Sequence, residues 1–285
     1  MTMKKLITDT NVWYNIGNGL YDIERLKRDY DLCPTTINVL EILSKINGTN
    51  YIIRKNALMA MRPFLGNILS SNDRYLDDLW HIKDSRNLQN IYITNYLDAI
   101  QRSTSFDEFE SSLSVYKNLF SLAALKDHQE KEWNSMRTDI NNIMLMWKPD
   151  YIPNSGNNKY LYMKKQMANR KDIELCSQTY IDWVTAALYV RACGSKQSLF
   201  DKYFQKAQQS LLPYIQVYKH YLLHCATTSH AEENDYGDLE LFLYGCLKKA
   251  GTDCEYILGT AEKKWHDIAQ KASYSRIINT DVYKV

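Results

Sequence analysis

The stretch that most constrains the fold is residues 4–11, with the sequence Lys-Lys-Leu-Ile-Thr-Asp-Thr-Asn. A short apolar run ends there abruptly in Asp9. This pattern is typical of a buried parallel strand that brings one acid to the carboxyl edge of a sheet. Open α/β proteins place their ligands and catalytic groups at that edge. The sequence therefore predicts that function depends on which other acids meet Asp9 there.

Strands are predicted at both ends of the chain, with helices between them. The predicted strands cover residues 3–8, 31–33, 254–259 and 276–278. After Pro34, Thr35 or Thr36 can cap a helix that carries Glu41. Apolar residues at i, i+3 and i+4 predict that residues 51–224 are almost wholly helical. Strand–helix alternation favours a parallel sheet, and the alternative is a mainly helical protein with no α/β core.

Composition sets only broad bounds on function. With 285 residues, 45% of them hydrophobic, the chain can bury a large core, and a net charge of +2 neither favours nor excludes nucleic acid. No window approaches the roughly 20 apolar residues of a membrane span. No long apolar stretch follows Lys4 and Lys5, so no signal peptide is expected. The six cysteines lack C-x-x-C spacing, which predicts reduced thiols in a cytoplasmic protein.

Four acidic stretches have a recognisable order along the chain. Asp9-Thr10-Asn11 follows the first strand, and Glu41 lies in the helix after a short strand and a proline. Asn234-Asp235-Tyr236-Gly237-Asp238 opens an apolar helix, and Thr260-Ala261-Glu262 follows the next strand. In these stretches the sequence resembles the PIN-domain nucleases. Two departures stand out: Glu262 replaces the usual Asp, and either Asp235 or Asp238 can fill the third place.

The resemblance implies a fold class and a domain organisation. We expect an α/β protein with a PIN-like three-layer α/β/α core and a short central parallel sheet, enlarged by a mostly helical insertion. The core would comprise residues 1–55 and 225–285, and the insertion residues 56–224. The resemblance covers only the ends of the chain, since the helical middle has no counterpart in a minimal PIN domain.

The resemblance also implies a metal-dependent endoribonuclease that uses Mg²⁺ or Mn²⁺. Its catalytic residues would be Asp9, Glu41, Asp238 and Glu262. Metal ligands would be drawn from Asp9, Glu41, Asp235 and Asp238, with Asn11 and Thr260 in support. Hard divalent ions prefer such oxygen ligands. RNA would be the substrate. A protein antitoxin or a homo-oligomer would be a partner, because many small PIN proteins are toxins of toxin–antitoxin pairs. No membrane partner is expected.

The same residues have purely structural interpretations. Asp9 can be an ordinary helix cap, and Asp235, Asp238 and Glu262 can be first-turn acids that complement a helix dipole. The basic residues Arg25, Lys27, Arg54 and Lys55 can bind RNA phosphates or simply lie on solvated faces. With Glu262 in place of Asp, a catalytically degenerate PIN-like scaffold that binds protein or RNA through its helical region is the alternative function.

Overall fold

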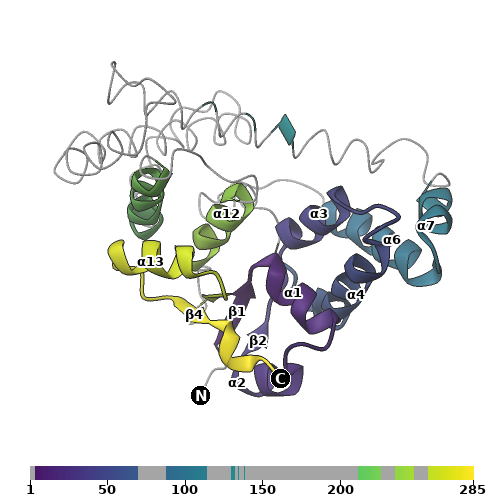
Figure 1. Cartoon of the computed structure of the whole chain (residues 1–285), viewed down its shortest axis with the longest axis horizontal. Helices are drawn as coiled ribbons and strands as arrows, with labels where there is room; N and C mark the ends of the chain where they lie inside the picture. Colours follow the sequence, from purple (N-terminus) through teal and green to yellow (C-terminus); the bar gives the residue numbers. More distant parts are fainter. Residues whose placement is uncertain are drawn as a thin grey trace.

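The computed structural model describes residues 4–69, 88–113, 211–225, 235–246 and 256–285, together with positions 130, 131, 134 and 138 (Figure 1). The N-terminal elements are β1 (Lys5–Thr8), α1 (Thr10–Gly17), α2 (Ile23–Asp29), β2 (Asp31–Leu32), α3 (Thr36–Ser44), α4 (Tyr51–Met61) and the 3₁₀ helix η1 (Arg62–Asn67). They are followed by α6 (Leu88–Arg102), α7 (Phe106–Leu113) and a helix over residues 211–225. The chain then forms α12 (Asp235–Cys246), β3 (Tyr256–Thr260), α13 (Lys263–Lys271), β4 (Ile277–Asn279) and the 3₁₀ helix η3 (Thr280–Tyr283).

The four strands form one parallel sheet in the order β2-β1-β3-β4. Lys5 pairs with both Asp31 and Tyr256, so β1 lies in the middle of the sheet. The mixed α/β class and the positions of all four strands are confirmed, with boundaries shifted by one or two residues. The alternative of a helical protein without an α/β core is wrong.

The strand order creates a point where the chain reverses its direction across the sheet. From β1 the chain passes through α1 and α2 to β2 on one side, whereas from β3 it passes through α13 to β4 on the other. In α/β proteins, ligands bind beyond the carboxyl ends of the two strands at such a point, which are β1 and β3 in this sheet. The backbone N–H of Asp9 donates to the carbonyl of Gly259 (3.1 Å), which extends the pairing to that edge.

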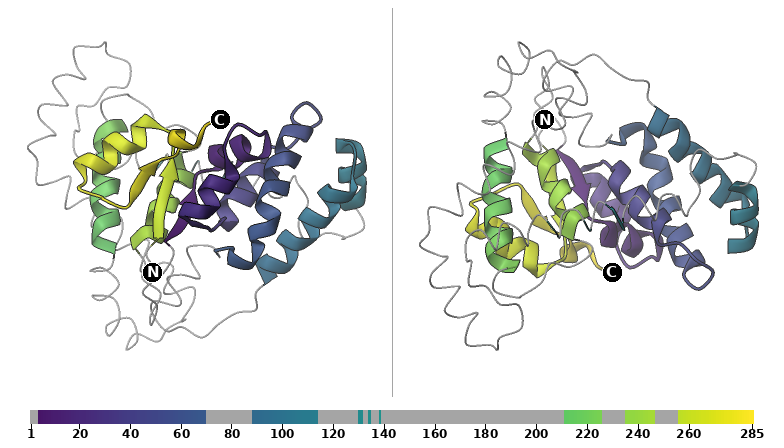
Figure 2. Two further views of the ribbon diagram at one scale, coloured as in Figure 1. Left: turned by 90° about the horizontal axis from the view of Figure 1, so that it is seen from below. Right: turned by 90° about the horizontal axis from the view of Figure 1, so that it is seen from above.

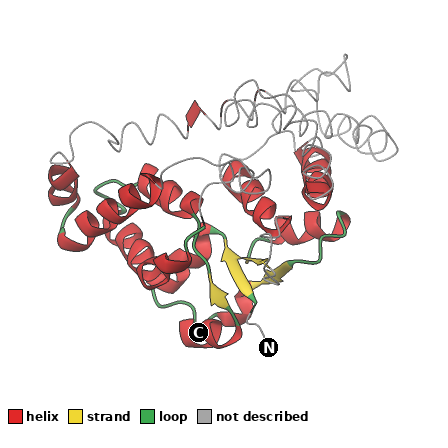
Figure 3. Ribbon diagram, turned by 180° about the vertical axis from the view of Figure 1, so that it is seen from behind, coloured by secondary structure: helices red, strands yellow, loops and turns green. Residues whose placement is uncertain are grey.

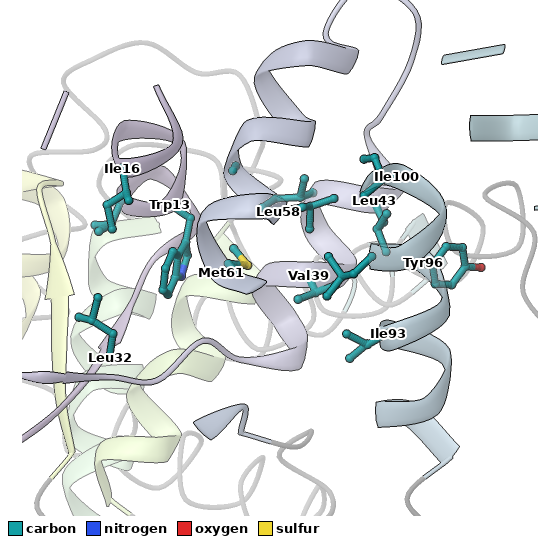
Figure 4. Close-up of a cluster of buried hydrophobic side chains, with 14 of the residues drawn as sticks. Trp13, Ile16, Leu32, Val39, Leu43, Leu58, Met61, Ile93, Tyr96 and Ile100 are labelled. Atoms are coloured by element: carbon teal, nitrogen blue, oxygen red, sulfur yellow. The ribbon is translucent and has the colours of Figure 1, made fainter. Parts of the chain in front are cut away.

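Helices cover both faces of the sheet because its strands are apolar on both sides. Leu6 and Ile257 contribute to one hydrophobic cluster, whose further members come from α1, α3, α4 and α6 (Figure 4). Ile7 and Leu258 contribute to the second cluster, together with α12, α13 and the helix at 211–225. The two groups of helices lie on opposite sides of the strands in all views (Figures 1, 2 and 3).

Local chemistry fixes the helices that carry the acids. Asp9 is the N-cap of α1 and accepts from the N–H of Val12 (3.0 Å). Thr35, one of the two predicted caps of α3, forms a capping box with Asn38. Gly17 allows α1 to touch α4, because a Cβ at this position would come within 2.5 Å of the carbonyl carbon of Asn56.

Parts of residues 56–224, the range of the predicted insertion, belong to the two clusters. Leu97 and Ile100 of α6 pack with the first cluster, and Tyr218 and Leu222 with the second. The division into core and insertion stays a prediction, and the predicted helices between residues 139 and 210 lie outside the described residues. Within the described segments, no helix has the length and apolar character needed to cross a membrane.

Candidate functional site

Four acids from four elements approach one another at the carboxyl edge of the sheet. Asp9 follows β1, Glu41 lies in α3, Asp238 in the first turn of α12, and Glu262 between β3 and α13. Burial is the largest effect on Asp238 and raises its pKa well above the usual range; the charges of Asp9, Glu262 and Glu41 raise it further. Each of the other three acids thus interacts electrostatically with Asp238.

Asp9 is almost fully buried, with 2% of its surface exposed. One carboxylate oxygen accepts from the Val12 N–H, and the other accepts from the hydroxyl of Thr260. Burial, followed by the charges of Glu262 and Glu41, raises the pKa of Asp9 to about 7, against the opposing effect of these two hydrogen bonds. Asp9 is therefore both the helix cap that the structural interpretation predicted and a member of the acidic cluster.

Glu41 is held by residues that the sequence analysis did not single out. The hydroxyl of Thr10 donates to Glu41 Oε2 (2.6 Å). Asn38 Nδ2 donates to the carbonyl of Thr8 (3.1 Å) and is 3.3 Å from Thr10 Oγ1. Thr10 lies inside the Asp9–Asn11 stretch, and Asn38 lies three positions before Glu41 on the same helix. Helical spacing could have revealed this support.

Asp238 is anchored by an aromatic side chain from α13. The indole N–H of Trp265 donates to Asp238 Oδ2 (2.9 Å), and both side chains are buried. One residue earlier, α12 passes close to α3, because a Cβ on Gly237 would lie 3.7 Å from Glu41 Oε2. That separation is ordinary van der Waals contact, so the start of α12 lies beside Glu41.

Glu262 and Glu41 form the more accessible part of the cluster. Their side chains are 33% and 19% exposed, whereas Asp9 and Asp238 are buried. Asn11, predicted to support the site, donates through Nδ2 to Glu262 Oε1 (2.8 Å). The cluster therefore extends from the interior towards the surface.

Asp235, the other candidate for the third position, has different partners. It is buried, forms an ion pair with Lys264 and accepts from the hydroxyl of Tyr221 (3.0 Å). The charges of Asp9 and Glu41 act on Asp238. On α13, Lys264 pairs with Asp235 and the next residue, Trp265, donates to Asp238.

All four basic residues considered for RNA binding have hydrogen-bond or ion-pair partners within the protein. Arg25 donates to the carbonyl of Val282 (3.0 Å), Lys27 pairs with Glu24 (2.8 Å), and Lys55 donates to the carbonyl of Ser103 (2.5 Å).

Arg54, the fourth, donates to the carbonyl of Ile42 (3.0 Å). Its guanidinium lies 5.5 Å from the ring centroid of Tyr14. Burial raises the pKa of Tyr14 to about 12; the charge of Arg54 opposes this shift and that of Glu41 adds to it. Arg54 and Tyr14 therefore border the Glu41 side of the cluster.

The donor set has the chemistry of a site for a hard divalent cation. Carboxylates are the preferred ligands of Mg²⁺ and Mn²⁺, and several of them in one place repel each other without a cation. Among the residues that the structure describes, no group of three or more His, Cys, Asp or Glu side chains is arranged to hold a metal ion. In the acidic cluster, each of the four carboxylates accepts a hydrogen bond from one of these side chains: Thr10, Asn11, Thr260 and Trp265. A carboxylate has about four lone-pair positions, so these bonds can orient it while it also binds a cation.

Comparison with known proteins found no relative of this chain. No protein-family model matches the sequence, no curated protein matches it, and no solved structure matches the fold.

Proposed function

We propose that this protein is a metal-dependent ribonuclease that hydrolyses RNA phosphodiesters at the acidic cluster. The observation that carries the proposal is the electrostatic coupling of Asp238 to Asp9, Glu41 and Glu262, with Asp9 and Asp238 both buried. Burying these neighbouring carboxylates destabilises the folded state, and a divalent cation bound among them would offset that loss of free energy.

The residues have separate tasks in this proposal. Asp9, Glu41, Asp238 and Glu262 would hold Mg²⁺ or Mn²⁺. When bound, such an ion makes a coordinated water more acidic and offsets the charge that develops on a phosphate. Thr260 and Thr10 orient the carboxylates of Asp9 and Glu41 by hydrogen bonds, which is how neighbouring groups usually fix metal ligands.

The resemblance to the PIN-domain nucleases supports the same reaction. The four acidic stretches follow the order of that family, and a parallel sheet with an acid after its central strand is compatible with it. An antitoxin partner and a role in a toxin–antitoxin pair are further expectations of the resemblance. No feature of the described residues bears on either one.

The test compares two aspartates that both cap helices. Asp9 caps α1 and Asp22 caps α2 in the same way, and asparagine caps helices as well as aspartate does. We expect Asp9→Asn to lower Mn²⁺-dependent cleavage of single-stranded RNA by at least about 100-fold, because a metal contributes several kcal/mol to the barrier reduction. Asp22→Asn should cleave at the wild-type rate.

Metal binding provides a second readout that does not depend on activity. Mn²⁺ at about 100 times its dissociation constant should stabilise the wild type and Asp22→Asn by about 2.7 kcal/mol, but not Asp9→Asn. Equal cleavage by Asp9→Asn and wild type would exclude this site. A wild type that neither cleaves RNA nor is stabilised by Mn²⁺ would instead support the degenerate scaffold.

A further inference from the structure

A lysine that the proposed reaction has not used lies beside the acidic cluster. Lys264 Nζ pairs with Asp235 Oδ1, lies 4.0 Å from Glu262 Oε2 and sits over the ring of Trp265, 5.0 Å from its centroid. Trp265 is the residue that donates to Asp238. Lys264 therefore contacts one member of the cluster and the anchor of another.

Buried side chains on the interior side fix the position of the Lys264 ammonium. Asp235 is 2% exposed and also accepts from Tyr221, whose ring stacks on Trp265 at a centroid distance of 5.6 Å. The Lys264 side chain is itself only 15% exposed. Desolvation offsets most of the attraction in such a buried ion pair, so the pair adds little net stability. It does fix the ammonium of Lys264 beside Glu262.

The charge balance of the proposed site suggests a function for the Lys264 ammonium. One divalent cation among four carboxylates leaves an excess of negative charge, which would repel an RNA phosphate. Lys264 places a positive charge next to Glu262, the most exposed of the four acids. Lysine is a common phosphate ligand that acts as a point charge.

We propose that Lys264 binds a phosphate of the RNA at the acidic cluster and that Asp235 is the positioning residue that holds it there. The inference rests on the proposed ribonuclease function. It gives Asp235 a role other than that of a metal ligand. Lys45 lies 3.8 Å from Glu41 Oε1 and is a weaker candidate. Its side chain is about twice as exposed as that of Lys264, and its ion pair joins residues one helical turn apart in sequence.

The experiment measures how RNA binding depends on salt. Removing Lys264 alone would leave the carboxylate of Asp235 buried and unpaired, so the informative comparison is between Asp235→Asn and the double variant Asp235→Asn/Lys264→Gln. Both lack the buried carboxylate charge, and only the second lacks the ammonium. Binding of a fluorescently labelled single-stranded oligouridine is followed between about 50 and 200 mM KCl. Ca²⁺ replaces Mn²⁺ to limit cleavage, and Lys271→Gln in the last turn of α13 is the control.

In Asp235→Asn the side-chain amide oxygen can still accept from Lys264, so the ammonium stays near the cluster. Relative to this variant, we expect the double variant to lose about 0.7 from the slope of log K against log salt, the amount for one phosphate contact on a single strand. Its affinity should be about tenfold lower. Lys271→Gln and Lys264→Arg should keep the wild-type slope. In Mn²⁺, Asp235→Asn should cleave more slowly than wild type, and the double variant should cleave more slowly still.

The outcomes separate this inference from the proposed function. A wild type that cleaves RNA, together with equal slopes for Asp235→Asn and the double variant, would refute the role of Lys264 and leave the nuclease intact. A wild type that binds no oligonucleotide and no Mn²⁺ would overturn both.

Discussion

The raised pKa of Asp9 predicts how the stability of the metal-free protein depends on pH. Burial and the neighbouring acids raise this pKa from an ordinary value of 3.8 to about 7. The folded state therefore binds a proton between these values that the unfolded state releases. The resulting stabilisation is fully present below the unfolded pKa and is lost as pH rises through the folded pKa.

The magnitude follows from the shift. At about pH 5 the folded-state pKa is about two units higher, and at 1.36 kcal/mol per unit the proton on Asp9 contributes about 2.7 kcal/mol. At about pH 7.5 only a few tenths of a kcal/mol remain, so the free energy of unfolding should fall by about 2.5 kcal/mol through this one group. The charge of Asp9 also raises the pKa of Asp238. Removing the Asp9 charge therefore removes the pH dependence due to Asp9 and part of that due to Asp238.

The assay is urea unfolding with EDTA at a series of pH values, comparing wild type with Asp9→Asn. Between about pH 5 and pH 7.5, the fall in the free energy of unfolding should be smaller in the variant than in the wild type by about 2.5 kcal/mol or more. Adding Mn²⁺ should remove most of the decline in the wild type, because a cation favours the ionised carboxylate. Parallel curves for the two proteins would refute the argument that the site buries an uncompensated charge.

Two further variants test the groups that hold the acids. Thr10→Val removes the hydroxyl that donates to Glu41 (2.6 Å) and should lower cleavage about 10- to 100-fold with little loss of stability. Thr10→Ser keeps the hydroxyl and should retain activity. An unchanged rate in Thr10→Val would show that this hydrogen bond does not position Glu41. Trp265→Phe removes the donor to Asp238 (2.9 Å), which should raise the pKa of that acid further, weaken Mn²⁺ binding in calorimetry and cost about 1–3 kcal/mol in urea unfolding; full Mn²⁺ affinity would argue against Asp238 as a ligand.

The sheet could be predicted from the sequence because each strand has a local signal. The apolar run before Asp9 and the run before Thr260 are buried on both faces, as parallel strands require. The end of α3 does not follow from the position of the nearest glycine: the helix stops at Ser44, before Gly48. Lys45 already leaves the helical conformation there, so the glycine lies in the following turn.

The third acid could not be chosen from the sequence. Asp235 and Asp238 are three positions apart on one helix, which places them on nearly the same face, and both are first-turn acids. They differ in their partners on α13, which are Lys264 for Asp235 and Trp265 for Asp238. Such long-range contacts between side chains leave no trace in helical periodicity.

The proposed site is assembled from distant parts of the chain, and this has a consequence for synthesis. Thr260 and its partner Asp9 are 251 positions apart, and β1 remains without its neighbour β3 until that strand has been made. A nascent chain emerges N-terminus first, so an unfinished copy carries Asp9 and Glu41 but none of the groups that complete the cluster. A ribonuclease built this way would be inactive until the segments that carry Asp238 and Glu262 had been synthesised and had folded against β1.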